Sequence, residues 1–198
     1  MTHFILLIII PHDIFMKGEA AIKAYIEENM RPYDEQIEME SHIIKTKEEL
    51  EKEFEEFKSK MKYTDTESFL DSNDYELDKN GNAIGINNQN SIFDYYGIGG
   101  NWNGILRGKK IKQSKGKDDM IAKNSIKVEK FLKKYNQDKE NNTYYNVIDA
   151  NRTLHRAKAY GWFGSSIEKI GKDEWQHMYE KILNDSKQDY IINLDCHV

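Results

Sequence analysis

The hydrophobic pattern of the chain begins with an uninterrupted apolar run. Residues 3–10, His-Phe-Ile-Leu-Leu-Ile-Ile-Ile, are rich in β-branched side chains and show no polar alternation. Such a run predicts a central strand that is covered on at least one face and paired on both edges, and Pro11 ends it. The run is too short to cross a bilayer and follows no basic residue, so neither a transmembrane helix nor a signal peptide is expected.

Apolar residues recur every three or four positions in several later segments, and this spacing predicts amphipathic helices. The segments are 17–30, 46–61, 118–135 and 173–184. Pro32 closes the first of them, and Thr46 with Glu49 forms a capping box at the start of the second.

Alternation and β-branched or aromatic residues predict further strands. These strands are 36–44, 144–148 and 190–198. The second of them turns at Asp149-Ala-Asn151 into a returning strand that ends at His155, which makes a hairpin. Between Tyr63 and Asn90 the chain is rich in Asp and Asn, with a turn signal at Asp78-Lys-Asn-Gly81, so we expect loops with short extended pieces there.

This order of elements is a β-α-β-β-α-β skeleton. We therefore predict one α+β domain over residues 1–198, a ferredoxin-like sandwich with a large helical and loop insertion at about 45–142 that carries a glycine and aromatic motif. In that fold the first and last strands are antiparallel neighbours, and both helices of the skeleton pack on one face of the sheet. Asp195 and His197 then lie near His3 and not near His12.

Composition and charge narrow the functions only slightly. Hydrophobic residues make up 38% of the chain and aromatic residues 12%, enough for a buried core. The net charge is −5, with 34 acidic and 29 basic side chains along the chain, so no strong field attracts nucleic-acid phosphates and nucleic-acid binding is not expected. Cys196 is the single cysteine and has no partner for an internal disulfide, which favours a reducing compartment, the cytoplasm.

Glycine and aromatic residues are concentrated between Ser91 and Leu106, where four of each stand in sixteen residues. The glycines permit positive φ and close backbone approach, and Tyr96 and Trp102 offer faces on which a flat ring can stack. A nucleotide-like ligand suits this chemistry, although the spacings match neither the dinucleotide fingerprint nor a P-loop. A tight corner that only packs explains the same residues.

A second aromatic–glycine cluster, Tyr160-Gly-Trp-Phe-Gly164, follows His155, and we predict that both clusters line one pocket. At least one of Gly99 and Gly100 is expected to hold a positive φ. The predicted ligand-binding residues are Asp94, Tyr95, Tyr96, Gly99, Gly100, Trp102, His155 and Trp162.

Histidine–aspartate pairs supply the candidate catalytic groups. Asp195 and His197 stand two apart on a strand and point to the same face, whereas Cys196 points to the other. A carboxylate beside an imidazole orients a general base, and the catalytic candidates are His155, Asp195 and His197. A structural Asp–His pair is the alternative.

No metal site and no particular cofactor are indicated, since none of the six histidines forms a His-x-x-x-His pair. A basic loop from Arg107 to Lys117 holds six Lys or Arg residues. These basic residues either contact a phosphate-bearing ligand or are ordinary lysines on the surface.

Several separated motifs resemble a family of uncharacterised small proteins found in bacteria, their phages and mobile elements. The motifs are the apolar run ending in Pro11, Arg31-Pro-Tyr-Asp-Glu35, Asp78-Lys-Asn-Gly81, Asp94-Tyr-Tyr-Gly-Ile-Gly-Gly-Asn-Trp-Asn-Gly104, Leu154-His155, Gly161-Trp-Phe-Gly164 and Asp195-Cys-His197. That family has tryptophan where Phe93 stands and arginine where Asn101 stands, so an anion contact by the arginine is not implied here. The resemblance implies an accessory, counter-defence role without naming a reaction.

Three functions follow as hypotheses. The first is an accessory protein of a phage or mobile element that binds a small nucleotide-like ligand, or a host defence protein, through an aromatic and glycine pocket. The second is a hydrolase or transferase that uses a His/Asp pair, with His155 or His197, as general base. The third is a structural interaction module whose surface is its acidic helices. The sequence specifies neither the ligand nor the oligomeric state.

Overall fold

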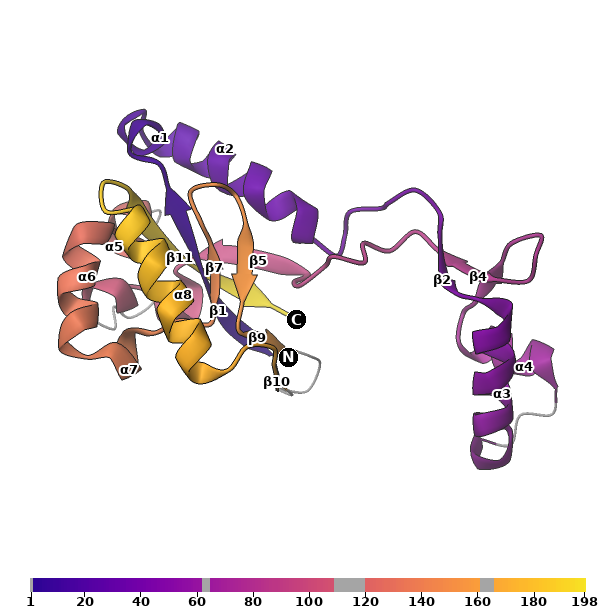
Figure 1. Ribbon diagram of the computed structural model, residues 1–198. Helices are drawn as coiled ribbons and strands as arrows, with labels where there is room; N and C mark the ends of the chain where they lie inside the picture. Colours follow the sequence, from indigo (N-terminus) through magenta and orange to yellow (C-terminus); the bar gives the residue numbers. More distant parts are fainter. Residues whose placement is uncertain (1, 62–64, 109–119, 161–165) are drawn as a thin grey trace. The chain divides into compact units, whose positions relative to one another are not determined.

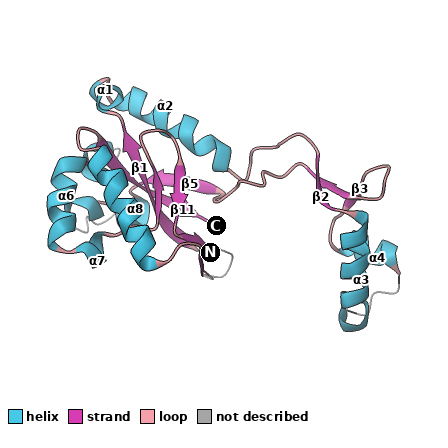
Figure 2. Cartoon of the chain, viewed as in Figure 1, coloured by secondary structure: helices cyan, strands magenta, loops and turns pink. Residues whose placement is uncertain are grey.

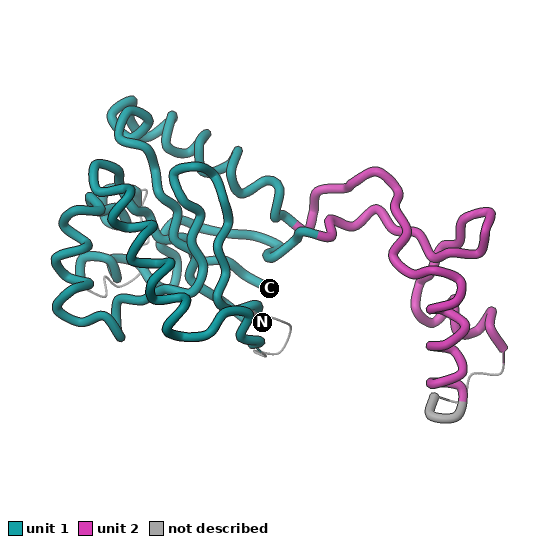
Figure 3. Tube along the Cα trace, in the orientation of Figure 1, with its two compact units in different colours: residues 1–34, 90–198 teal, residues 35–89 magenta. Residues whose placement is uncertain are grey.

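The computed structural model describes residues 2–61, 65–108, 120–160 and 166–198 (Figure 1). The chain divides into two compact units, and both helices and strands are present, as expected of an α+β protein (Figures 2 and 3). The first unit joins residues 1–34 to residues 90–198, and the second is residues 35–89.

The second unit is not the insertion that we predicted at about 45–142. Residues 90–142, with the glycine and aromatic motif, fold with the first unit because they add two strands to its sheet and a buried helix to its core.

The first unit is organised around its sheet, whose strand order is β5-β11-β1-β7-β8, with β6 also paired to β11. The strands are β1 (His3–Ile10), β5 (Tyr95–Ile98), β6 (Ser125–Lys127), β7 (Asn146–Ile148), β8 (Leu154–Arg156) and β11 (Tyr190–His197). β1 and β11 are antiparallel over their whole length, from His3 opposite His197 to Ile10 opposite Tyr190. The predicted pairing of the first and last strands is confirmed.

The ferredoxin-like strand order is not confirmed. β7 lies parallel to β1 and carries β8 outward to the edge of the sheet. A ferredoxin-like sheet instead places the second strand of this hairpin beside the first strand of the chain.

Helices cover both faces of the sheet. The helices of the first unit are α1 (His12–Met16), α2 (Glu19–Met30), α5 (Met120–Asn124), α6 (Val128–Gln137), α7 (Lys139–Asn142) and α8 (Lys172–Asp185). On β1, Leu6 and Ile8 pack in one cluster with side chains of α2, whereas Leu7 and Ile9 pack in another with side chains of α6 and α8.

The prediction that helices 17–30 and 173–184 share one face is therefore wrong. Every residue of β1 from Leu6 to Ile10 is fully buried, so the strand is apolar on both faces and each face needs cover. Full burial of one Leu or Ile contributes about 1.5–3 kcal/mol, which makes this strand a large part of the stability of the core.

The continuous helix predicted over 118–135 is also wrong. α5 and α6 are separated by β6, because Ser125, Ile126 and Lys127 pair with the first residues of β11. The smaller elements of the unit are η1 (Arg31–Tyr33), η2 (Gly100–Trp102), η3 (Ile105–Arg107), β9 (Lys158–Tyr160) and β10 (Ser166–Glu168). Within the described ranges, no helix has both the length and the apolar run needed to cross a bilayer.

The second unit packs two helices on a three-stranded sheet of order β2-β4-β3. Its elements are β2 (His42–Lys45), α3 (Lys47–Met61), α4 (Thr66–Ser72), β3 (Glu76–Leu77) and β4 (Ala83–Gly85). The predicted capping box is present, since the Thr46 N–H donates to Glu49 Oε2 at 2.8 Å and the Glu49 N–H donates to Thr46 Oγ1 at 3.3 Å. The predicted turn closes through the Gly81 N–H, which donates to the Asp78 carbonyl at 3.0 Å. The strand expected at 36–44 is shorter and begins at His42.

The chain leaves the first unit and returns to it at neighbouring points. Asp34 forms a β-bridge with Phe93, and the Ile92 N–H donates to the Tyr33 carbonyl at 2.9 Å. Residues 35–89 therefore form an insertion that is closed at its base.

Deleting residues 190–198 should abolish the cooperative unfolding of the first unit. The deletion removes the hydrogen-bonding partner of three strands and exposes apolar surface on both faces of the sheet. Thermal unfolding followed by near-ultraviolet circular dichroism measures the effect. As a control, replacing residues 36–88 by a short Gly-Ser linker should leave the transition in place, because the cut ends are neighbours. A truncated chain that melts cooperatively near the full-length temperature would contradict this architecture.

Candidate functional site

The glycine-rich stretch and the C-terminal strand meet at one end of the first unit's sheet. β5 pairs with the last residues of β11, so that Tyr95 stands opposite His197, and His197 in turn stands opposite His3 of β1. These three side chains therefore lie across three neighbouring strands on the same face. Asp195 shares this face because it is two residues from His197.

Each of the two histidines is held by its own carboxylate. His3 Nδ1 lies 2.9 Å from Asp195 Oδ1, and His197 Nδ1 lies 2.7 Å from Asp94 Oδ1. Since an ionised carboxylate only accepts hydrogen bonds, each Nδ1–H donates, and the other ring nitrogen is left to act as acceptor in the neutral imidazole. The two imidazole rings meet edge to face with their centroids 5.0 Å apart.

The two imidazoles differ in access to solvent. The His3 side chain is 30% exposed, whereas the His197 side chain is 6% exposed beneath the ring of Tyr95, which stacks on it at 4.8 Å. No described residue bonds the buried His197 Nε2. An unsatisfied buried polar atom costs about 1–3 kcal/mol.

The glycines of the motif close the backbone onto this cluster. Gly99 and Gly100 have φ of 78° and 46°, which confirms the predicted positive φ. A Cβ on Gly99 would lie 2.2 Å from Asn124 Nδ2, and one on Gly100 would lie 2.2 Å from Asp195 Oδ2. The next N–H, of Asn101, donates to Asp195 Oδ2 at 2.8 Å. These two glycines therefore pack against side chains, and they allow the backbone to hold the Asp195 carboxylate.

A small cavity opens beside His3. It has a volume of about 280 Å³ and is bordered by His3, Ile5, Trp102 and Tyr145, among others. The Trp102 ring lies 6.4 Å from the His3 ring, centroid to centroid. The exposed histidine of the cluster therefore faces a space that has an aromatic wall.

His155 lies elsewhere, on the edge strand β8. Three strands separate β8 from β5, and four steps of about 4.8 Å give about 19 Å between them. The structure therefore separates His155 from β5, the strand of the glycine-rich stretch that carries Tyr95 and Tyr96. Trp162 and the rest of the second aromatic–glycine cluster, 161–164, lie outside the described residues, as does most of the basic loop, 109–117.

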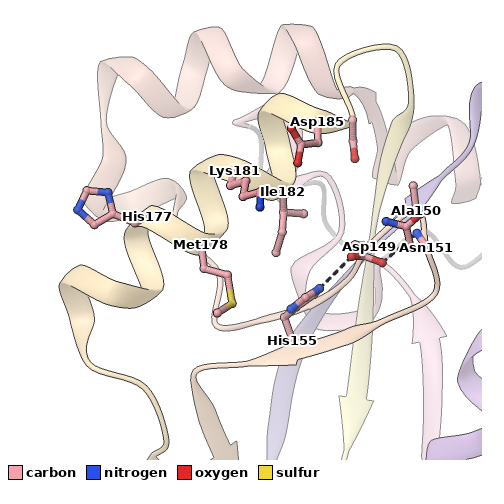
Figure 4. A pocket seen from close by; sticks show the side chains of 10 residues that line it. Asp149, Ala150, Asn151, His155, His177, Met178, Lys181, Ile182 and Asp185 are labelled. Carbon is pink, nitrogen blue, oxygen red and sulfur yellow. Dashed lines mark hydrogen bonds and ion pairs between the residues drawn. The ribbon is translucent and has the colours of Figure 1, made fainter.

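His155 forms a pair of its own with Asp149, with His155 Nε2 at 2.9 Å from Asp149 Oδ2 (Figure 4). The pair borders a cavity of about 640 Å³ against α8, whose Met178 and Ile182 form the apolar side. The other oxygen of Asp149 accepts the N–H groups of Asn151 and Thr153, each at 2.9 Å. This carboxylate thus organises the turn between β7 and β8, which is a sufficient structural reason for the pair.

Tyr96, a predicted ligand-binding residue, and its neighbour across the sheet, Cys196, both pack in the core. Tyr96 points to the face opposite Tyr95 and packs against Phe93 with ring centroids 5.4 Å apart, and burial raises the pKa of its hydroxyl. Cys196 is fully buried on the same face, where burial raises the pKa of its thiol well above the usual range. A thiol in such a site is a poor nucleophile.

The cluster therefore gathers Asp94, Tyr95, Trp102, Asp195 and His197 from the predicted set. In the described part of the chain, no three or more His, Cys, Asp or Glu side chains are placed to hold a metal ion. The residue whose role sequence reasoning missed is His3. Its signal was the antiparallel register of the terminal strands, which places it opposite His197.

Replacing Gly100 by alanine should lower the free energy of unfolding by more than about 1 kcal/mol, through strain at positive φ and the clash with Asp195. The matched control is Gly97→Ala in the same segment, where an added Cβ meets nothing within 4 Å. We expect that change to stay within about 0.5 kcal/mol. Urea unfolding of the two variants measures the difference, and equal stabilities would contradict the role of Gly100.

The Cys196 thiol should be unreactive in the folded protein, because it is buried and protonated. Titration with Ellman's reagent should detect no thiol under native conditions and one thiol per chain in denaturant. Rapid labelling of the native chain would show that this face of the sheet is open to solvent.

No family model, curated protein or solved structure matches the chain. The interpretation of the cluster therefore depends on its own geometry and chemistry.

Proposed function

We propose that the protein is a hydrolase or transferase of the general acid–base type, with His3 as the catalytic base and Asp195 as the residue that orients it. The observation that carries the proposal is the His3–Asp195 pair, in which one ring nitrogen is fixed by a largely buried carboxylate and the His3 side chain borders a cavity. A carboxylate in this position selects the tautomer of the imidazole and stabilises the imidazolium that forms when the base takes a proton.

The proton transfers follow from this arrangement. His3 Nε2 takes a proton from water, or from the hydroxyl group of an acceptor, whose oxygen forms a bond to the electrophilic centre of the substrate. As the bond to the leaving group breaks, the imidazolium returns the proton to the leaving group. A positioned general base of this kind contributes about 10²–10⁴-fold in rate.

The other members of the cluster position this pair. The Asn101 N–H holds the second oxygen of Asp195, and the edge of the His197 imidazole borders the His3 ring. Trp102 supplies a flat surface on which an aromatic part of the substrate can rest.

The His3–Asp195 pair is favoured over the His155–Asp149 pair by a structural argument. Asp149 and His155 lie six residues apart in one hairpin, and the carboxylate completes the turn between them. His3 and Asp195 lie 192 residues apart, and their pair closes no local turn. Burying a carboxylate there costs free energy that apolar side chains would not cost, so a role in chemistry explains it better.

Binding of a small nucleotide-like ligand without turnover is the second candidate. Trp102 beside the cavity favours it, because an aromatic wall serves binding as well as catalysis. The accessory role and the host defence protein suggested by the resemblance belong to this candidate.

Turnover of three p-nitrophenyl compounds, the acetate, the phosphate and the bis-phosphate, tests the enzyme. Their planar ring suits Trp102, and release of nitrophenolate is measured directly. We expect His3→Gln and Asp195→Asn to lower kcat/KM by at least about 100-fold. The matched control, His155→Gln, removes a histidine that is also held by an aspartate, through Nε2 instead of Nδ1, and should leave kcat/KM unchanged.

Turnover that survives His3→Gln, or that falls equally in His155→Gln, would contradict the assignment. A different outcome would favour a binding protein over an enzyme. In that outcome none of the three compounds releases nitrophenolate, but p-nitrophenyl phosphate binds, and His3→Gln weakens its binding.

A further inference from the structure

A basic cavity with an aromatic wall lies at the opposite end of β11 from the histidine cluster. Tyr190 begins this strand and His197 ends it, and seven steps of about 3.4 Å place the two about 24 Å apart. The cavity has a volume of about 550 Å³, within the usual range for small-molecule sites. The residues used in the argument are Phe15, Arg107, Ile126, Lys127, Lys130 and Tyr190.

The lining has three cationic side chains and no carboxylate among the described residues. Arg107 is fixed in place, because its Nε and Nη2 donate to the Ser125 carbonyl at 3.1 and 2.9 Å. Lys127 has only a distant ionic neighbour, with its Nζ 3.9 Å from Glu129 Oε2. No ion pair within the described part of the chain engages Lys130, so the cavity has uncompensated positive charge although the whole chain carries −5.

Phe15 and Tyr190 form the aromatic part of the lining. The Phe15 and Tyr190 rings stack with centroids 3.6 Å apart and planes within 4°. In the pairing of β6 with β11, Tyr190 stands opposite Lys127, so the aromatic wall and the cations are brought together by strand register. Ile126 adds apolar surface to the same cavity.

We propose that this cavity binds a nucleoside phosphate, with the phosphate groups against Arg107, Lys127 and Lys130 and the base on the outer surface of the Phe15–Tyr190 stack. Several cations without a carboxylate select a multiply charged anion, and phosphate oxygens accept charge-assisted hydrogen bonds from Arg and Lys. Inorganic phosphate alone would make no use of the aromatic wall. A nucleoside without phosphate would leave the cations unused.

Isothermal titration of the full chain with ATP tests the site, with adenosine and inorganic tripolyphosphate as the two halves of the ligand. We expect ATP to bind in the micromolar range, and adenosine and tripolyphosphate each to bind at least 10-fold more weakly. Lys130→Gln, a change at a solvent-accessible helix position, should weaken ATP binding about 10-fold, since it removes one charge-assisted contact. Tyr190→Leu should weaken ATP more than tripolyphosphate.

The matched control is Lys133→Gln. Lys133 lies about one turn after Lys130 in α6 and does not border the cavity, so this change should leave ATP binding unchanged. The proposal is overturned if ATP does not bind at millimolar concentration, if tripolyphosphate binds as tightly as ATP, or if the Lys130 and Lys133 variants behave alike. A single-stranded oligoadenylate that binds more than 10-fold tighter than ATP would also overturn it, in favour of a polymeric ligand. The site is independent of the proposed catalytic function, so His3→Gln should retain ATP binding.

Discussion

The antiparallel pairing of β1 with β11 is the interaction on which the first unit depends. It joins the two ends of the sequence over eight residues and places a strand that is apolar on both faces in the interior of the sheet. Two hydrophobic clusters follow from it, one beneath α2 and one beneath α6 and α8. The same register sets His3 opposite His197, so the pairing that builds the core also assembles the polar cluster at its end.

Through its carboxylate, Asp195 contacts both the His3 side chain and the backbone of the glycine-rich segment. Its carboxylate lies within hydrogen-bond distance of His3 and accepts the N–H of Asn101, and this contact is possible because Gly100 has no side chain. A buried carboxylate is stable only when its oxygens are bonded, so the glycine-rich segment stabilises the charge on which His3 depends. At Gly99 and Gly100 the lack of a side chain allows the backbone to lie close to Asn124 and Asp195.

The insertion of residues 35–89 has a different character from the unit that carries it. It holds fifteen acidic and seven basic side chains, whereas the rest of the chain holds nineteen acidic and twenty-two basic ones. The modest charge of the whole chain therefore conceals two units of opposite sign. Arg107, Lys127 and Lys130, which border the cavity beside the start of β11, belong to the positive unit, which agrees with an anionic ligand there.

The sequence by itself determined the elements whose signals are local. The apolar run of β1, the capping box at Thr46 and the turn at Asp78 all formed as predicted, because periodicity and backbone hydrogen bonding act over a few residues. Positive φ in the glycine-rich segment was predictable for the same reason. Only the tertiary structure decided the order of the strands, the faces that the helices cover and the separation of His155 from the glycine-rich segment. These features depend on pairing between residues far apart in the chain. The hydrophobic pattern of a strand does not specify which other strand it pairs with. The predicted pairing of the terminal strands placed His3 near Asp195, and the structure added the contact between their side chains, at 2.9 Å.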